Sequence, residues 1–243
     1  MQLIEAKVES SVEASVNDST ADAGERPGQP RTTLQITEIF YSLQGESRSV
    51  GWPTVFVRLT GCPLRCSYCD TRYAYTGGRT VAIDSILQRV NAFQAGYVTV
   101  TGGEPLSQPG CRKLLTQLCD AGYEVSLETS GAVSIRDIDR RVSIVMDLKT
   151  PASGECGCNR WENIELLRPQ DQVKFVICDE ADYLWTKRIL LEYDLASRCE
   201  VLLSPAFGQL DGATLADWLL ADRLPVRMQL QLHKILWGDQ PGR

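Results

Sequence analysis

The sequence contains one histidine, His233, among its 243 residues, no apolar run long enough to span a bilayer, and no excess of basic residues. A single histidine excludes a histidine-rich metal centre and makes any Ser-His-Asp or Cys-His mechanism depend on that residue. Because a spanning helix needs about 20 consecutive apolar residues, we expect no contact with the membrane interior. The 25 Lys and Arg residues against 31 Asp and Glu give a net charge of −6, which argues against nucleic-acid and anionic-membrane partners.

The N-terminal segment has few apolar side chains to bury. Residues 1–32 are rich in Ser, Glu, Ala, Asp and Gly, so we predict a disordered extension there and one folded domain over residues 33–243. Charged residues such as Glu5 and Lys7 interrupt the apolar stretch that a secretory signal requires. The expected location is therefore cytoplasmic. In that compartment the nine cysteines indicate reduced thiols and a possible metal site, not a disulfide framework.

Beyond residue 33, apolar runs of strand length alternate with helical patterns. The predicted strands are Thr54–Leu59, Gly96–Thr101, Glu124–Glu128, Val142–Asp147, Gln172–Cys178, Glu200–Leu203 and Arg227–Leu232, and the predicted helices are Ala82–Phe93, Pro109–Ala121, Glu180–Glu192 and Thr214–Ala221. The density of Val, Ile and Leu indicates strands covered on both faces, as in a parallel sheet. The alternation predicts an α/β fold whose βα units form an open or partly closed barrel, with the chemistry at the carboxyl ends of the strands.

A loop with three cysteines directly follows the first strong strand. Cys62, Cys66 and Cys69 are spaced so that a short loop can turn all three sulfurs toward one centre. A 4Fe–4S cluster with three cysteine ligands leaves one iron open for chemistry. A structural zinc is the rival interpretation, but it needs a fourth ligand from His233 or a distant cysteine. Three buried core cysteines remain the simplest alternative.

The spacing Cys-x3-Cys-x2-Cys resembles the defining motif of the radical S-adenosylmethionine (SAM) superfamily. The resemblance implies an incomplete (partial) β/α barrel of the radical SAM type, in which SAM binds the open iron and is cleaved to a 5′-deoxyadenosyl radical. Four strand-end motifs resemble SAM contacts of that superfamily. They comprise Gly103 and Glu104 in a Gly-Gly-Glu loop, Glu128 and Ser130, the run Asp147, Leu148 and Lys149, and finally Ser204 and Pro205. Taken alone, Gly-Gly-Glu is equally typical of an ordinary strand-end turn.

A second group of residues narrows the resemblance to one family. The stretch Leu43, Gln44, Gly45 and Glu46, with Arg58 before the cysteines and Thr71 after them, resembles the 7-carboxy-7-deazaguanine synthase family from about Ile36 to Lys234. That family converts 6-carboxytetrahydropterin into 7-carboxy-7-deazaguanine for queuosine and related 7-deazapurines, releases ammonia and regenerates SAM. The resemblance also implies a homodimer, Mg²⁺ as a cofactor, and a reductant such as flavodoxin.

The resemblance assigns roles that suit these side chains. The acceptor oxygens of Gln44 and Glu46 suit the N–H groups of a pterin, and the planar fork of Arg58 suits its carboxylate. The Thr71 hydroxyl is a hard oxygen ligand of the kind that Mg²⁺ takes. Thr101 occupies the place of a substrate-contacting threonine. On the residues alone, Glu46 and Arg58 could form a surface ion pair, Gln44 could be a loop residue and Thr71 a helix or turn cap.

Some features and alternatives stay open. Cys156 and Cys158 form a Cys-Gly-Cys loop that we interpret as exposed, although two close cysteines can bind a metal. We expect Cys111, Cys119, Cys178 and Cys199 to be small core residues. His233, at the end of the last predicted strand, is interpreted as structural or substrate-lining. A glycyl-radical-enzyme activase and a non-catalytic iron–sulfur or zinc module are the competing functions.

Overall fold

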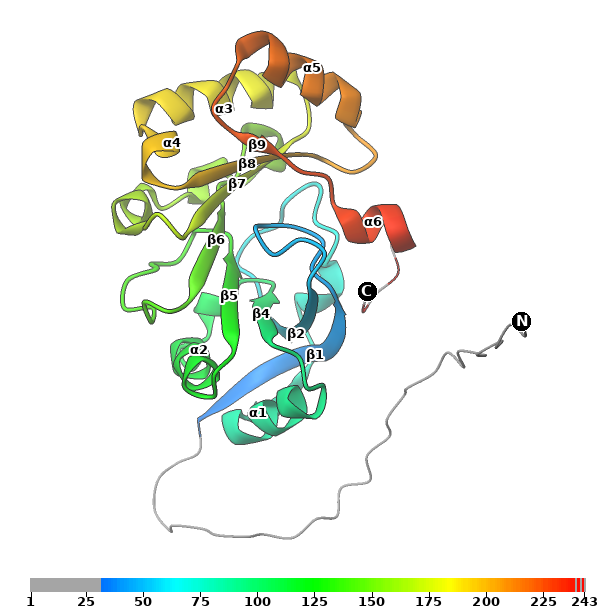
Figure 1. The fold of residues 1–243 in the computed structure, drawn as a ribbon, viewed down its shortest axis with the longest axis vertical. Helices are drawn as coiled ribbons and strands as arrows, with labels where there is room; N and C mark the ends of the chain where they lie inside the picture. Colours follow the sequence, from blue (N-terminus) through cyan, green and yellow to red (C-terminus); the bar gives the residue numbers. More distant parts are fainter. Residues whose placement is uncertain (1–31, 239, 241, 243) are drawn as a thin grey trace, which may run out of the picture. The chain divides into compact units, whose positions relative to one another are not determined.

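The fold is built on one nine-stranded sheet, whose strand order is β3-β1-β2-β4-β5-β6-β7-β8-β9 (Figure 1). The computed structural model describes residues 32–238, 240 and 242. The strands from β2 to β9 run parallel, whereas β1 is antiparallel to both β2 and β3. The strands are β1 Thr33–Leu43, β2 Pro53–Leu59, β3 Arg79–Ala82, β4 Tyr97–Gly102, β5 Glu124–Thr129, β6 Ser143–Asp147, β7 Gln172–Ile177, β8 Glu200–Pro205 and β9 Arg227–Met228. The sheet is open, because β3 and β9 form its two ends.

Helices cover the outer side of the curved sheet (Figure 1). They are α1 Ile83–Ala92, α2 Cys111–Asp120, α3 Glu180–Glu192, α4 Leu195–Arg198 and α5 Gly212–Asp222. The last helix, α6 Leu232–Trp237, lies instead beside the loop that follows β1 (Figure 1). Two of the helices begin at aspartate caps: Asp179 accepts a hydrogen bond from Asp182 N at the start of α3, and Asp211 accepts one from Thr214 N at the start of α5. The predicted α/β fold is confirmed.

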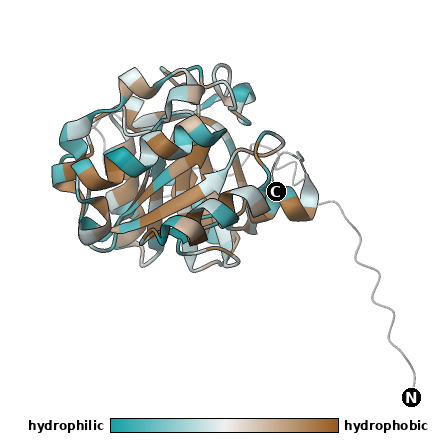
Figure 2. Ribbon diagram, turned by 90° about the horizontal axis from the view of Figure 1, so that it is seen from above, coloured by the Kyte–Doolittle hydropathy of each residue, from teal (hydrophilic) through white to brown (hydrophobic). Residues whose placement is uncertain are grey.

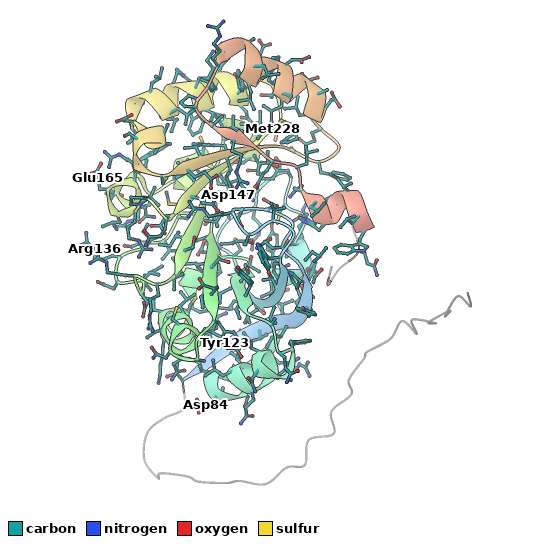
Figure 3. All side chains as sticks on the ribbon, viewed as in Figure 1. Asp84, Tyr123, Arg136, Asp147, Glu165 and Met228 are labelled. Atoms are coloured by element: carbon teal, nitrogen blue, oxygen red, sulfur yellow. The ribbon has the colours of Figure 1, made fainter. Side chains whose placement is uncertain are left out.

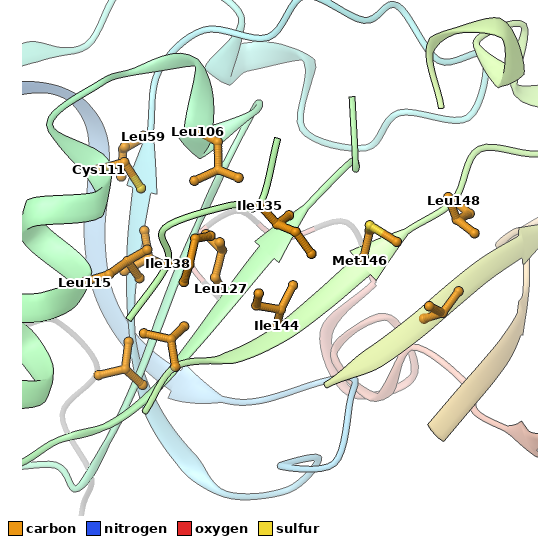
Figure 4. Packing of buried hydrophobic residues seen from close by; sticks show 14 of the residues in the cluster. Leu59, Leu106, Cys111, Leu115, Leu127, Ile135, Ile138, Ile144, Met146 and Leu148 are labelled. Carbon is orange, nitrogen blue, oxygen red and sulfur yellow. The ribbon is translucent and has the colours of Figure 1, made fainter. Parts of the chain in front are cut away.

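The core lies between the helices and the outer face of the sheet. Alternate residues of each parallel strand point into it, as Val55 and Val57 do in β2 and Val98 and Val100 in β4. Figure 4 shows Cys111 and Leu115 of α2 near Leu127 of β5 in this cluster. The strands are brown in Figure 2, whereas the covering helices carry both brown and teal residues, which is the pattern of elements with one buried side.

The structure corrects three sequence expectations. The strands are not covered by packed elements on both faces, because the face opposite the core carries polar and charged side chains that line a cavity. The last predicted strand is wrong beyond Met228: β9 has two residues and His233 belongs to helix α6. The strands β1 and β3 and the short helix α4 were not predicted. The predicted extension over residues 1–32 lies, apart from Thr32, outside the described residues.

Candidate active site

Five adjacent parallel strands each contribute at least one charged or polar side chain to a cavity of about 500 Å³. From β2 to β7 these residues include Arg58, Thr101, Glu128, Asp147 and Lys174. They share one face because side chains alternate along a strand and the register pairs Arg58 with Thr101 and Asp147 with Lys174. Arg58, Thr101, Glu128 and Asp147 lie at or next to the carboxyl ends of their strands, where Figure 3 labels Asp147, whereas Lys174 lies in the middle of β7. The cavity thus lies where the sequence predicts the chemistry.

The three cysteines of the predicted cluster loop, Cys62, Cys66 and Cys69, all line this cavity and are free thiols. Two arginines hold the loop in shape: Arg65 donates to the Cys62 carbonyl (2.8 Å) and Arg72 to the Ser67 carbonyl (2.7 Å). Burial raises the pKa of Cys62, and it raises the pKa of Cys66 to about 11. Both thiols are therefore protonated at neutral pH until a metal displaces the proton.

The cysteine loop offers three soft ligands to one cavity. Among the described residues, no group of three or more His, Cys, Asp or Glu side chains is already placed to hold a metal ion. Three thiols that line one cavity are the donor set of an iron–sulfur cluster, and His233 lines the same cavity.

The Gly-Gly-Glu loop packs tightly against the cysteine loop. A Cβ atom on Gly103 would lie 2.3 Å from the Gly61 carbonyl oxygen and 2.7 Å from Cys62 Cβ, so only glycine fits there. Glu104 lies behind the cavity and is fully buried. Its carboxylate accepts hydrogen bonds from Ser130 N (2.7 Å), Ser130 Oγ (2.6 Å) and Thr129 Oγ1 (2.9 Å). Glu104 thereby joins the end of β4 to the end of β5.

The other residues predicted to contact SAM fall into two groups. Glu128, Ser130, Asp147 and Lys149 line the cavity. Leu148, Ser204 and Pro205 are buried and do not line it. After Pro205 the chain reaches the cavity with Ala206 and Phe207 instead. The strand-end motifs thus lie beside the cavity, but only some of their side chains line it.

The Leu-Gln-Gly-Glu stretch forms a second wall of the cavity, and Leu43, Gln44, Gly45 and Glu46 all line it. Gln44 Nε2 donates to Thr99 Oγ1 (3.1 Å) and to Glu128 Oε1 (3.2 Å), and Thr101 Oγ1 donates to Glu128 Oε2 (2.9 Å). Gln44 is buried, so the alternative of an ordinary loop residue is wrong.

Glu46 and Arg58 do not pair with each other. Arg58 Nε donates to Glu38 Oε1 at 2.7 Å, and its guanidinium carbon lies 5.9 Å from the ring centroids of both Phe40 and Tyr73. Glu46 accepts hydrogen bonds from Lys174 Nζ, Gln231 Nε2 and Gln229 Nε2, at 2.7, 2.9 and 3.3 Å. Both side chains are mostly buried, so the alternative of a surface ion pair is wrong.

Thr71 lies at the far end of the cysteine loop and lines the cavity together with Asp70. Its hydroxyl donates to Asp70 Oδ1 (2.7 Å), and Lys234 Nζ lies 3.5 Å from Asp70 Oδ2. Thr71 precedes a 3-10 turn at Arg72–Ala74, but its side chain makes no capping hydrogen bond. Thr71 therefore occupies the cap position of this turn without capping it through its side chain, and it lines the cavity beside a carboxylate.

His233 and Gln231 complete the cavity from the C-terminal part of the chain. Leu232 N donates to the Gly45 carbonyl (3.0 Å), which places α6 beside the loop after β1 (Figure 1). His233 thus lines the cavity, as expected, although from a helix. Sequence reasoning missed Gln231, Asp70 and Lys174 as cavity residues. Lys174 had left a signal, because a lysine within an apolar parallel strand needs a buried partner.

The remaining cysteines lie outside the cavity. Cys111, Cys119 and Cys199 are buried as predicted, whereas Cys178 is only partly buried. Cys156 and Cys158 occupy a 3-10 turn, and Cys158 Sγ donates to Glu155 Oε2 (3.3 Å). This bond raises the pKa of Cys158, which keeps the thiol neutral.

Comparisons with known proteins agree with this geometry. Residues 56–149 match the family model of the radical SAM superfamily. A 7-carboxy-7-deazaguanine synthase from Chlorobaculum tepidum is 49% identical over 208 residues, which span 84% of this chain and 94% of the relative. A protein of the same name from Koribacter versatilis is 42% identical and is matched over 98% of its length, against 85% of this chain.

Solved structures share the fold. The crystal structure of QueE from Escherichia coli superposes with a TM-score of 0.68 at 23% identity, over 83% of this chain and 95% of that one. Streptococcus suis SuiB bound to S-adenosylmethionine superposes with a TM-score of 0.50 at 15% identity, over 70% of this chain and 48% of that one. No helix among the described residues is both long and apolar enough to cross a membrane. The identity to the curated relatives, over nearly their whole length, shows that the chain belongs to the 7-carboxy-7-deazaguanine synthase family of radical SAM enzymes.

Proposed function

We propose that this protein converts 6-carboxy-5,6,7,8-tetrahydropterin into 7-carboxy-7-deazaguanine, with release of ammonia, for queuosine or other 7-deazapurines. The observation that carries the proposal is the meeting of two motifs in one cavity. The three thiols of the cysteine loop and the Leu-Gln-Gly-Glu wall both line it. A radical generated at the cysteine loop would thus arise in the same cavity as the substrate.

The cysteine side of the cavity suits a 4Fe–4S cluster and SAM. Cys62, Cys66 and Cys69 would hold the cluster, and the backbone at Gly103 would approach SAM closely. When bound, cluster and SAM supply the radical that removes a hydrogen atom from the substrate. Further SAM contacts would come from Glu128, Ser130, Asp147 and Lys149, with Glu104, Leu148, Ser204 and Pro205 supporting them from behind.

The opposite wall suits the pterin. Gln44 and Glu46 would accept N–H bonds from its aminopyrimidinone edge, with Leu43, Gly45 and Thr101 beside the ring. Arg58 would bind the carboxylate through its planar fork, because Glu38 and the Phe40 and Tyr73 rings fix the guanidinium. Burial by itself lowers the pKa of Arg58, but the neighbouring Tyr73 and Glu38 raise it above its usual value, so the fork stays charged.

We assign the Mg²⁺ site to Thr71. Its hydroxyl lies against the Asp70 carboxylate, and substrate oxygens and water would complete the hard, oxygen-only ligand set that this ion prefers. A positive ion there would offset the charge of the substrate carboxylate.

The family resemblance supports further assignments. We propose a cytoplasmic homodimer that receives electrons from a flavodoxin-like reductant. Light scattering at graded concentrations tests the dimer, and reduction of the loaded enzyme by flavodoxin, followed by its visible absorbance, tests the electron donor.

Anaerobic incubation tests the proposed activity directly. Protein reconstituted with iron and sulfide is supplied with SAM, dithionite, Mg²⁺ and 6-carboxytetrahydropterin, and the products are identified by mass spectrometry. We expect 7-carboxy-7-deazaguanine and an equal amount of ammonia. Cleavage of SAM without any change in the pterin would reject the proposed substrate.

A further inference from the structure

Lys174 is the one charged residue of β7, in the middle of a strand that is otherwise apolar after Gln172. Its neighbours in β7, Val173 and Phe175, are fully buried in the core, while its own side chain points the other way and lines the cavity with 15% of its surface exposed. Placing an ammonium group at so enclosed a position is costly unless carboxylates lie beside it. The partners of Lys174 therefore indicate why the lysine is there.

Two carboxylates from different parts of the chain meet at Lys174 Nζ. Glu46 Oε2 lies 2.7 Å away and Asp147 Oδ2 lies 3.4 Å away. Asp147 is the register partner of Lys174 on the adjacent strand, whereas Glu46 is 128 residues distant in sequence. Lys174 thus joins the wall that we assign to the pterin to the strand end that we assign to SAM.

The charges around this contact favour an ionised pair. Burial by itself would lower the pKa of Lys174, but Glu46, Asp147 and Glu128 raise it well above its usual value. Burial by itself would raise the pKa of Glu46, but Lys174, with smaller effects of Gln231 and His233, lowers it below its usual value. Lys149 Nζ lies 3.1 Å from Asp147 Oδ2, so Asp147 has a second cation while Glu46 depends chiefly on Lys174.

The hydrogen bonds that Glu46 already accepts limit how many more it can accept from a ligand. A carboxylate offers about four lone-pair positions, and the donors Lys174, Gln231 and Gln229 take three of them. To accept two parallel N–H bonds from a pterin, the Glu46 carboxylate must therefore lose one of its three present hydrogen bonds. Gln229, at 3.3 Å, makes the longest of the three bonds. The charged bond from Lys174 is the strongest and fixes the carboxylate while the amides adjust.

We propose that Lys174 is a positioning residue for substrate recognition: it holds the Glu46 carboxylate ionised and oriented toward the pterin, and anchors it to Asp147. This inference rests on the proposed function. It assigns to β7 a part in substrate choice through a residue that belongs to none of the motifs discussed above.

Lys174→Met tests the proposal, because methionine keeps most of the apolar stem and removes the charged donor. We expect unchanged iron content, and a loss of pterin affinity that exceeds any change in the affinity for SAM. The dissociation constant for the pterin should rise about ten- to a hundredfold, as expected for loss of one charge-assisted bond. The 5′-deoxyadenosine released per product should also rise. Lys174→Arg keeps the charge and should restore part of the affinity.

A double-mutant cycle separates positioning from general damage. Because Lys174 acts through Glu46, Lys174→Met should weaken pterin binding far less in a Glu46→Gln background than in the parent. The matched control is Lys187→Met, which removes an ion pair with Asp222 (2.6 Å) far from the cavity and should change nothing in these assays. If Lys174→Met does not fold, Lys174→Gln, which retains an N–H donor, takes its place in the cycle.

The pH dependence gives a second readout. Without Lys174 the pKa of Glu46 should rise. As the pH is lowered, Glu46 in the variant should therefore become protonated, and pterin affinity should fall, at a higher pH than in the parent. In the Glu46→Gln background this acidic fall in pterin affinity should be absent. Additive effects of the two substitutions on pterin binding, or parental pterin affinity in Lys174→Met, would overturn the inference. The proposed function would still stand in that case, because the parent would still convert the pterin. A parent that does not bind or convert the pterin would overturn both.

Discussion

The imidazole of His233 packs directly on the Cα of Gly45, so that a Cβ atom added to Gly45 would lie 2.1 Å from Nδ1. The backbone reinforces this contact, because Leu232 N donates to the Gly45 carbonyl. The close approach explains why a glycine stands between Gln44 and Glu46, whose side chains both face the cavity.

Gly45→Ala should therefore displace His233 and the start of α6 from the cavity. We expect pterin turnover to fall at least about tenfold, because small displacements of positioning groups are costly to rate. Iron content should stay parental. Gly96→Ala is the control, since a Cβ there meets nothing within 4 Å. Unchanged turnover in Gly45→Ala would show that α6 does not position the substrate.

The nine cysteines should divide into two functional groups. Ser at Cys62, Cys66 or Cys69 should abolish iron binding and SAM cleavage, because a hydroxyl is a poor ligand for iron in a cluster. Ser at Cys156 or Cys158 should leave both intact, since neither thiol lines the cavity. Iron content and 5′-deoxyadenosine release measure the two effects. Loss of iron after replacement of Cys156 or Cys158 would contradict the assignment of the cluster to Cys62, Cys66 and Cys69.

Thr71→Ala should weaken the response to Mg²⁺ and spare the cluster. The hydroxyl is one of several oxygen ligands, and the others come from substrate and water, so the Mg²⁺ concentration for half-maximal rate should rise without loss of all activity. Titration of product formation with Mg²⁺ measures this. A parental titration curve for the variant would place the ion elsewhere.

Asp182→Ala should destabilise the fold although the residue is remote from the chemistry. The buried Asp182 carboxylate accepts hydrogen bonds from Thr150 Oγ1, Ala152 N and Cys178 N, at 2.9, 2.9 and 3.1 Å. Leaving these donors unpaired should lower the free energy of unfolding by about 2–5 kcal/mol. Calorimetry of the metal-free protein should show Tm lower by roughly 5–15 °C. A change of Tm below a degree would mean that water replaces the carboxylate.

Arg58→Lys should impair substrate use while retaining the positive charge. Lysine cannot present a planar fork to the pterin carboxylate, and it cannot occupy the same place between the Phe40 and Tyr73 rings. We expect a higher KM for the pterin and more 5′-deoxyadenosine per product, with unchanged iron content. Parental KM and coupling would remove Arg58 from the substrate site.

Local patterns predicted much of the architecture, and their limits are equally physical. The parallel strands, the cysteine loop and the strand-end motifs could be recognised because they depend on short spacings. The run after Arg227 was ambiguous, since a short apolar segment fits a strand or a helix equally well. Within the motifs, which side chain faces the cavity depends on alternation along the strand: Asp147 lines it, whereas Leu148 is in the core.

Contacts between distant segments lay beyond the sequence alone. The motif residues Glu46 and Arg58 were recognised, but their partners, Lys174 and Glu38, were not. A single sequence does not show that Glu38 of β1 pairs with Arg58, or that Lys174 of β7 pairs with Glu46. The sheet order and register place these pairs together, and long-range pairing is what sequence periodicity does not encode.

The ratio of SAM consumed to product formed is the measurement that tests the central claim most directly. In anaerobic turnover with excess 6-carboxytetrahydropterin, 7-carboxy-7-deazaguanine should accumulate over many turnovers while SAM remains nearly constant, because the family regenerates it. Consumption of one SAM for every turnover, or SAM cleavage without 7-carboxy-7-deazaguanine, would contradict the account.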